Sequence, residues 1–340
     1  GNFRRRGISP PPKRNFLPMN TVKVKSYAKI NLTLDVTGTA GGYHLIDSFV
    51  ASLSLFDLVV VRARKDKLVS VEMHGMGSES IPPERNNALR AGEAFVKRFG
   101  SGGADVTVYK NIPIGAGLGG SSADAAGVLS GMAALYGADG EALGELADSL
   151  GSDTRYMLRG GFCRMRGRGE KLTPVPSGEK LHFLLLCPPS SVSSAECYRE
   201  YDRAPSRGAV TQNCIDAFLR GDMEDMGRYL TNALYPAALR LNADVGTAYA
   251  EAQSFSPLGV TMTGSGSCVA ALFPTAELCE WAKSRYRGKF RAYAAETTEP
   301  SPPKKKRSFG GLRSPFVLSE EEKEAAGFPD GGQGARNGLR

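Results

Sequence analysis

The first half of the chain alternates between strand-like and helix-like patterns of apolar residues. Residues 22–38 alternate apolar and polar side chains with the two-residue period of a strand, and residues 48–64 supply further strand material. Residues 86–99 have the spacing of a helix with one apolar face. Residues 104–112 indicate another strand, and residues 121–136 indicate a helix built from small side chains.

A second run of elements starts near residue 180. The pattern predicts a strand, three helices, a strand with its following loop, and a final helix, at 181–187, 211–220, 224–233, 243–253, 259–273 and 276–286. No internal repeat is visible. Strands and helices mix without strict alternation, which favours an α+β fold over a doubly wound parallel sheet.

Length and composition divide the chain into four segments. With 340 residues we expect two domains, at 19–175 and 176–299. Residues 1–18 and 300–340 are rich in Pro, Gly and charge and are expected to be disordered. Met19 is a candidate start, with a transit peptide as the alternative for residues 1–18; the "PKKKR" run resembles a nuclear import signal but is better explained as a solvated tail.

The net charge of +8 belongs to the two terminal segments. Residues 1–18 carry five basic and no acidic residues, and residues 300–340 carry eight basic and five acidic residues, so the globular part is neutral. We therefore expect no nucleic-acid partner. No apolar run approaches the ~20 residues of a membrane span, so no membrane partner is expected either.

The six cysteines and three histidines point away from a metal or disulfide framework. The cysteines show no C-x-x-C spacing, and three histidines leave little material for a structural zinc site. Scattered cysteines fit a reducing compartment. We expect a cytoplasmic protein, or a plastid one if residues 1–18 belong to a transit peptide.

The stretch "NIPIGAGLGGSSADAAG" at 111–127 contains the dinucleotide fingerprint G-x-G-x-x-G, and Asp139 follows at a suitable distance. Its surroundings oppose that interpretation, because Pro113 separates the strand from the glycines and Asp139 follows a helix rather than a second strand. A Walker A loop is excluded because no Lys-Ser/Thr pair follows. Glycine N–H groups, the hydroxyls of Ser121 and Ser122 and a helix N-terminus still predict a phosphate site.

Three motifs carry a resemblance to a known family. The run P-x-x-x-G-L-G-G-S-S-A-D-A-A from Pro113 to Ala126 resembles the ATP-binding motif of the GHMP small-molecule kinases. "YAKINLTLDVTG…GYHLIDSF" (27–49) and "MTGSGSCVAALF" (262–273) resemble the family's N-terminal and C-terminal motifs. The resemblance implies a ribosomal protein S5 domain 2-like N-terminal domain, a ferredoxin-like C-terminal domain, and an active site in the cleft between them.

The resemblance also implies roles for individual residues. Asp153 matches the catalytic aspartate and Lys29 the lysine beside it, although from the residues alone Asp153 could be a helix cap and Lys29 a solvated strand charge. ATP–Mg²⁺ is expected on Pro113, Gly115, Gly117, Leu118, Gly119, Gly120, Ser121 and Ser122, with Asn86 nearby and Ser121 or Ser122 as a metal contact. The family usually has Val-Pro after the aspartate, whereas this chain has Thr154-Arg155, which could place a cation beside Asp153.

The resemblance, through "GYH" and "GGSSADAA", also implies a substrate. It is a cytidine-diphospho methylerythritol, phosphorylated on its 2-hydroxyl in non-mevalonate isoprenoid precursor synthesis. Expected substrate contacts are Asn31, Tyr43, His44, Tyr198, Gly264, Ser265 and Gly266, with the two tyrosines closing on the cytosine and His44 bonding to it. The aromatic residues could instead be core packing. The alternatives are a GHMP kinase acting on mevalonate or homoserine, and a non-catalytic nucleotide-binding scaffold; a homodimer stays open.

Overall fold

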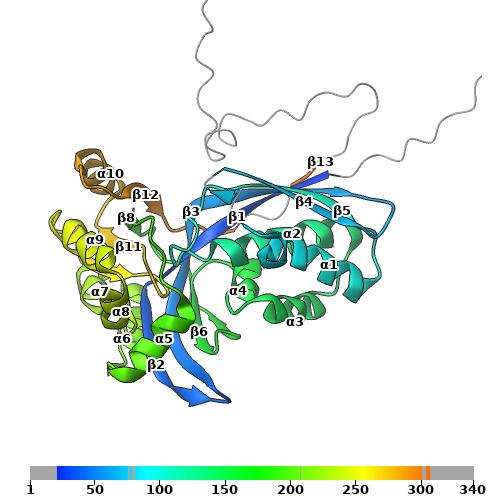
Figure 1. Ribbon diagram of the computed structural model, residues 1–340. Helices are drawn as coiled ribbons and strands as arrows, with labels where there is room; N and C mark the ends of the chain where they lie inside the picture. Colours follow the sequence, from blue (N-terminus) through cyan, green and yellow to red (C-terminus); the bar gives the residue numbers. More distant parts are fainter. Residues whose placement is uncertain (1–20, 76, 79–80, 207, 301–303, 307–340) are drawn as a thin grey trace, which may run out of the picture.

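The computed structural model describes residues 21–75, 77–78, 81–206, 208–300 and 304–306. It confirms the α+β class, with two sheets and helices packed against each (Figure 1). No helix in these ranges is both long and apolar enough to cross a membrane.

The larger sheet has nine strands. Its main path runs in the order β13-β1-β3-β2-β9, with β5 and β6 also paired to β3, β4 paired to β5, and β7 paired to β6. The strands are β1 (Thr21–Asn31), β2 (Thr33–Ala40), β3 (Tyr43–Ala63), β4 (Val69–His74), β5 (Ala104–Tyr109), β6 (Cys163–Gly167), β7 (Lys171–Pro174), β9 (Thr231–Asn232) and β13 (Lys304–Lys306).

Helices cover one face of this sheet in the first half of the chain (Figure 1). The helices of this half are the short 3-10 helix η2 (Pro83–Arg85), α1 (Asn87–Phe99), α2 (Gly120–Tyr136), α3 (Gly140–Leu150) and α4 (Thr154–Arg159). Of these, α1, α2 and α4 contact the sheet, and α3 packs against α1, α2 and α4. Helix α2 lies close to the sheet because it presents glycines there: a Cβ on Gly127 would meet Ser26 Oγ at 2.2 Å, and one on Gly131 would meet Val61 at 2.5 Å. The small side chains noted in the sequence therefore serve close helix–sheet packing.

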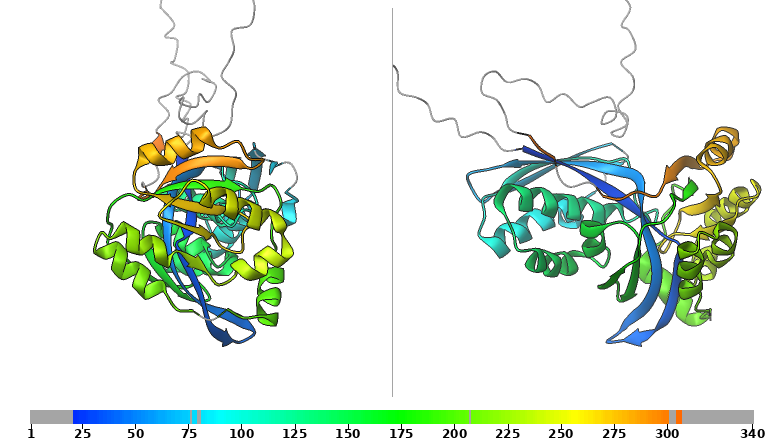
Figure 2. Two further views of the ribbon diagram at one scale, coloured as in Figure 1. Left: turned by 90° about the vertical axis from the view of Figure 1, so that its left-hand side faces the viewer. Right: turned by 180° about the vertical axis from the view of Figure 1, so that it is seen from behind.

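The second half has its own four-stranded antiparallel sheet. Its strand order is β10-β11-β8-β12, from β8 (His182–Cys187), β10 (Gly259–Met262), β11 (Val269–Phe273) and β12 (Arg291–Glu296). Its helices are α5 (Ser194–Arg203), α6 (Thr211–Leu219), α7 (Met223–Tyr229), α8 (Tyr235–Leu241), α9 (Ala243–Gln253) and α10 (Ala276–Arg285). Figure 2 shows the two halves side by side, joined by the long strands β1 and β3.

Several elements differ from the sequence prediction at positions where backbone pairing between strands determines where an element begins or ends. The predicted helix 224–233 ends at Tyr229, because Thr231 and Asn232 pair in parallel with β2. The predicted strand 22–38 bends at Leu32 into β1 and β2. Residues 304–306, assigned to a disordered tail, pair with β1 through their backbone, which side-chain periodicity does not report. The rest of the predicted tails, with Met19, lies outside the described residues apart from Pro300.

Candidate active site

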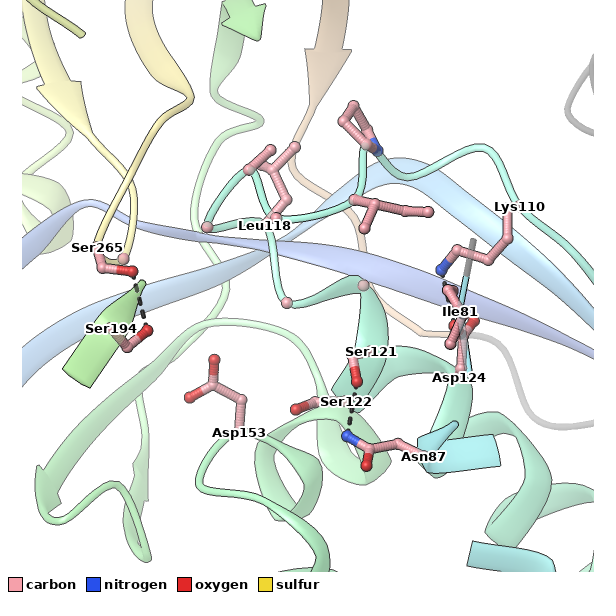
Figure 3. Close-up of a pocket in the computed structure, with 18 of the residues that line it drawn as sticks. Ile81, Asn87, Lys110, Leu118, Ser121, Ser122, Asp124, Asp153, Ser194 and Ser265 are labelled. Atoms are coloured by element: carbon pink, nitrogen blue, oxygen red, sulfur yellow. Dashed lines mark hydrogen bonds and ion pairs between the residues drawn. The ribbon is translucent and has the colours of Figure 1, made fainter. Parts of the chain in front are cut away.

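A cavity of about 510 Å³ lies where the loop between β5 and α2 meets the second half of the molecule. Its wall includes the loop residues 113–122, the start of α1, Lys29, Asp153 and the turn 264–266. Figure 3 shows Asp153, Ser194 and Ser265 at one end and Ile81, Lys110 and Asp124 at the other. The cavity therefore collects residues from all three sequence motifs.

The loop that enters α2, residues 113–122, has the backbone of an anion cradle and is referred to below as the phosphate loop. Gly115, Gly117 and Gly119 have φ values of +68°, +78° and +75°, a region that favours glycine. Gly119 is the N-cap of α2, and no side chain caps the helix there. The N–H groups of the first turn are thus left for a ligand, and the helix dipole favours a negatively charged one. This donor set fits the phosphates of ATP.

Two glycine turns, one from each half, are in backbone contact. A Cβ on Gly117 would lie 2.1 Å from the carbonyl oxygen of Thr263. The Thr263 hydroxyl donates to the carbonyl of Gly117 (3.1 Å), and the N–H of Cys268 donates to the carbonyl of Ala116 (3.1 Å). The 264–266 turn is therefore held against the phosphate loop.

Lys29 and Asp153 lie next to each other. Lys29 Nζ is 3.6 Å from Asp153 Oδ2 and donates to Asn31 Oδ1, which also accepts the N–H of Gly264 (3.0 Å). The Lys29 side chain is buried, unlike a solvated strand charge. Asp153 occupies the N-cap position of α4 but its side chain makes no capping bond, and it points into the cavity (Figure 3). The arrangement leaves a carboxylate available beside a buried cation.

The cation introduced by Thr154-Arg155, which could have been placed beside Asp153, pairs with residues of α3. The Arg155 guanidinium donates to Asp148 (2.8 Å) and Glu141 (3.0 Å), both on α3. These carboxylates raise the pKa of Arg155 above its ordinary value. The departure from the family pattern therefore ties α4 to α3.

A second cavity, of about 590 Å³, adjoins the first and holds the predicted base-binding residues. His44 Nε2 lies 2.7 Å from Asp202 Oδ1, and the imidazole stacks on Tyr198 with ring centroids 4.5 Å apart. Burial raises the pKa of Tyr198 above its ordinary value. Tyr43 is half exposed, with the Arg168 guanidinium over its ring. The two tyrosines expected to face one base thus each have another partner here.

Comparison with known proteins identifies the family. The model for the GHMP kinases N terminal domain matches residues 86–161, and the model for GHMP kinases C terminal matches residues 214–287. A curated 4-diphosphocytidyl-2-C-methyl-D-erythritol kinase from Pelotomaculum thermopropionicum is 34% identical over 76% of this chain and 92% of its own length. The chain belongs to the GHMP kinase family.

Other relatives of this GHMP kinase agree. The 4-diphosphocytidyl-2-C-methyl-D-erythritol kinase of Clostridium beijerinckii is 32% identical over 79% of this chain and 98% of its own. A crystal structure of 4-(cytidine 5'-diphospho)-2C-methyl-D-erythritol kinase superposes with a TM-score of 0.68 at 29% identity, covering 81% of this chain and 98% of that one. The L. major mevalonate kinase, with a TM-score of 0.64 at 14% identity over 84% and 98%, shows the fold alone.

Most residues that the motifs singled out line the two cavities of this GHMP kinase. Pro113 and the loop residues 115–122 line the first, while Tyr43, His44 and Tyr198 line the second. Asn86 also lines the first, but its Oδ1 accepts from the N–H groups of Ala88 and Leu89 and so caps α1. The Leu118 side chain is buried in the core, and its carbonyl accepts the N–H of Lys29 (3.0 Å).

Asn87, the neighbour of Asn86, was not predicted as a site residue from the sequence. Asn87 Nδ2 donates to Ser121 Oγ (2.6 Å), which fixes a hydroxyl of the phosphate loop from α1 (Figure 3). The sequence shows two consecutive asparagines at a helix start, and only the cap geometry separates their roles. Asn86 holds the helix, and Asn87 faces the loop.

A buried ion cluster beneath the loop was also missed. Lys110 Nζ bonds to Asp57 Oδ2 and to Asp124 Oδ2, the latter at 2.7 Å. Asp57 Oδ1 accepts the N–H groups of Asn111 (2.5 Å) and Ile112 (2.8 Å), where the loop leaves β5. Burial raises the pKa of the Asp124 carboxyl, with Lys110 opposing this. The cluster joins β3, the end of β5 and α2.

Proposed function

We propose that this kinase transfers the γ-phosphoryl group of ATP to the 2-hydroxyl of 4-diphosphocytidyl-2-C-methyl-D-erythritol, in the non-mevalonate synthesis of isoprenoid precursors. The observation that carries the proposal is the position of Lys29 and Asp153, which line both the phosphate-loop cavity and the cavity of Tyr43, His44 and Tyr198. The names of the curated relatives supply the substrate. Phosphoryl transfer needs two bound substrates and a base between them.

Asp153 and Lys29 have separate roles in the proposed transfer. The 2-hydroxyl gives its proton to the Asp153 carboxylate as its oxygen attacks the γ-phosphorus, and the bond from that phosphorus to the bridging oxygen breaks, releasing ADP. Lys29 offsets negative charge on the transferring group. Asn31 keeps the ammonium in place through its bond to Lys29.

The phosphate loop also offers places for a magnesium ion that travels with ATP. Magnesium prefers oxygen ligands and is usually held by one or two protein groups together with the phosphates, whose charge it neutralises. The described residues contain no group of three or more His, Cys, Asp and Glu that could hold a metal. We assign the protein contacts to the hydroxyls of Ser121 and Ser122, because they line the cavity at the start of α2, beside the N–H groups expected to bind the phosphates.

Turnover assays test the assignment. With ATP and the cytidyl substrate, wild type should form ADP and phosphorylated product, while Asp153→Asn should lose at least about a hundredfold in kcat and keep its affinity for ATP. Asp216→Asn, an exposed residue of α6 outside both cavities, is the matched control.

A panel with mevalonate and homoserine completes this test. The proposal is wrong if wild type turns over only one of these alcohols, or if Asp153→Asn retains the wild-type rate. A protein that binds ATP without turning over any of the three substrates would support the scaffold alternative.

A further inference from the structure

Arg168 lies at the tip of the β6–β7 hairpin, beside the predicted base-binding residues. It is flanked by Gly167 and Gly169, whose φ values of +74° and +115° form the turn. Antiparallel pairing places Gly167 opposite Ile46 of β3, three residues from Tyr43 (β6 and β3 in Figure 1). The fold thus delivers this side chain to the second cavity, which it lines together with Tyr43 and His44.

The contact with Tyr43 orients the guanidinium without using its hydrogen-bond donors. Its central carbon lies 3.7 Å from the centroid of the Tyr43 ring, a cation–π distance. Glu170, the nearest acid along the hairpin, accepts the backbone N–H of Arg168 at 2.6 Å. A stacked guanidinium keeps its N–H groups at the edge, where they can donate to an anion in pairs.

The charges around this cavity leave Arg168 as the cation to be neutralised. Lys29 lies 3.6 Å from Asp153, and Arg199 lies 3.9 Å from Glu196. Among the described residues, no carboxylate lies within 4.0 Å of the Arg168 guanidinium.

The first residues of α5 strengthen this positive character. Ser194 and Ala195 line the same cavity and bring the positive end of a ten-residue helix to it. The cavity therefore suits a ligand that carries negative charge next to a group that stacks.

We propose that Arg168 is a specificity-determining residue that binds the diphosphate of the cytidyl substrate while its guanidinium stays stacked on Tyr43. The inference rests on the proposed function for the identity of the substrate. It adds the side chain that recognises the diphosphate of that substrate. Two parallel N–H···O bonds to phosphate oxygens match the fork of an arginine, which a lysine cannot reproduce.

Calorimetric titration with CDP and with cytidine tests the contact without any turnover. Arg168→Ala should weaken the binding of CDP about tenfold, the loss of a charge-assisted hydrogen bond at an exposed side chain, and change the binding of cytidine less than twofold. The affinity of Arg168→Lys for CDP should lie between those of the wild type and Arg168→Ala. Arg166→Ala removes an exposed arginine from the same hairpin and should leave the affinities for CDP and for cytidine unchanged.

Steady-state kinetics on the same proteins give a second measurement. Arg168→Ala should raise KM for the cytidyl substrate about tenfold, with kcat and KM for ATP changed less than twofold. Equal losses for CDP and cytidine would overturn the proposal, because Arg168 would then only support the Tyr43 ring. An unchanged affinity for CDP, or a wild type that binds cytidine as tightly as CDP, would also overturn it. Failure of the proposed function would instead appear as a wild type without turnover.

Discussion

At the scale of single residues, the buried cluster of Lys110, Asp57 and Asp124 determines how the phosphate loop leaves the sheet. Both carboxylates share one ammonium, and Asp57 also holds two backbone N–H groups of the loop. Burial alone would lower the pKa of Lys110, but the two carboxylates outweigh it and raise that pKa above its ordinary value. The lysine therefore stays charged, and a neutral residue in its place leaves carboxylates buried without a counter-charge.

Lys110→Met should lower the free energy of unfolding by about 3–5 kcal/mol, the usual cost of removing one partner from a buried ion pair. Asp124→Asn should cost less than about 1.5 kcal/mol, because an amide oxygen can still accept the hydrogen bond from Lys110. Urea unfolding of both variants measures the difference. Equal destabilisation would show that Asp124 has to carry a charge.

Part of this site could be predicted from the sequence, for a physical reason. Lys29, Asp153 and the loop glycines lie in contiguous motifs, so their chemistry can be read locally. Asp57, Lys110 and Asp124 come from three elements and meet only through the pairing of β3 with β5 and the packing of α2. No local pattern marks Asp57 or Lys110, because a charged residue in a strand normally indicates an exposed face.

At the scale of elements, α2 depends on glycines at both of its ends, and these glycines serve different needs. Gly117 in the loop and Gly137 after the helix share a φ of +78°. A Cβ on Gly117 would collide with the backbone of Thr263, whereas one on Gly137 meets nothing within 4 Å. Substitutions at Gly117 and Gly137 therefore distinguish the cost of backbone strain alone from the cost of strain together with a steric clash.

Gly137→Ala should cost about 1–2 kcal/mol of unfolding free energy and leave the kinetics unchanged, because only the left-handed backbone is penalised. Gly117→Ala adds a clash that displaces the phosphate loop, and KM for ATP should rise at least about tenfold. Thermal unfolding and ATP kinetics of both variants measure this. Matching kinetics for the two would show that the loop tolerates a shift away from Thr263.

Elements with strong periodicity were predicted well, and elements defined by pairing were not. The helix predicted at 86–99 from its apolar face is α1 at Asn87–Phe99, and the helix predicted at 211–220 is α6 at Thr211–Leu219. The strands β6 and β7 have only five and four residues, too few for a pattern that stands out in the sequence, and β6 is held by its pairing with β3. Arg168 therefore reaches its place through a contact distant in sequence.

At the scale of the whole molecule, one hydrophobic core crosses the predicted domain boundary at residue 175. Ile30 and Phe49 of the first half pack in the same cluster as Phe183, Phe218 and Ala270 of the second. Strand β9 from the second half also pairs with β2. The two halves thus share buried surface of the kind that makes unfolding cooperative.

We therefore expect a single thermal unfolding transition. Trp281, the one tryptophan of the sequence, lies on α10 and reports on the second half, whereas far-ultraviolet circular dichroism reports on both. The two signals should change at the same temperature. A fluorescence transition that precedes the dichroism transition would show that the second half melts alone.

The backbone contact between Gly117 and Thr263 has a consequence for how such enzymes can be recombined. Each half contributes one loop, and the loop of the first half leaves room for Thr263 only because Gly117 has no side chain. A chimera that joins the first half of this kinase to the second half of a relative keeps its phosphate loop only if both turns come as a matched pair. The success of such an exchange then depends on the few backbone atoms where the two turns meet. The fit of the larger domain surfaces matters less.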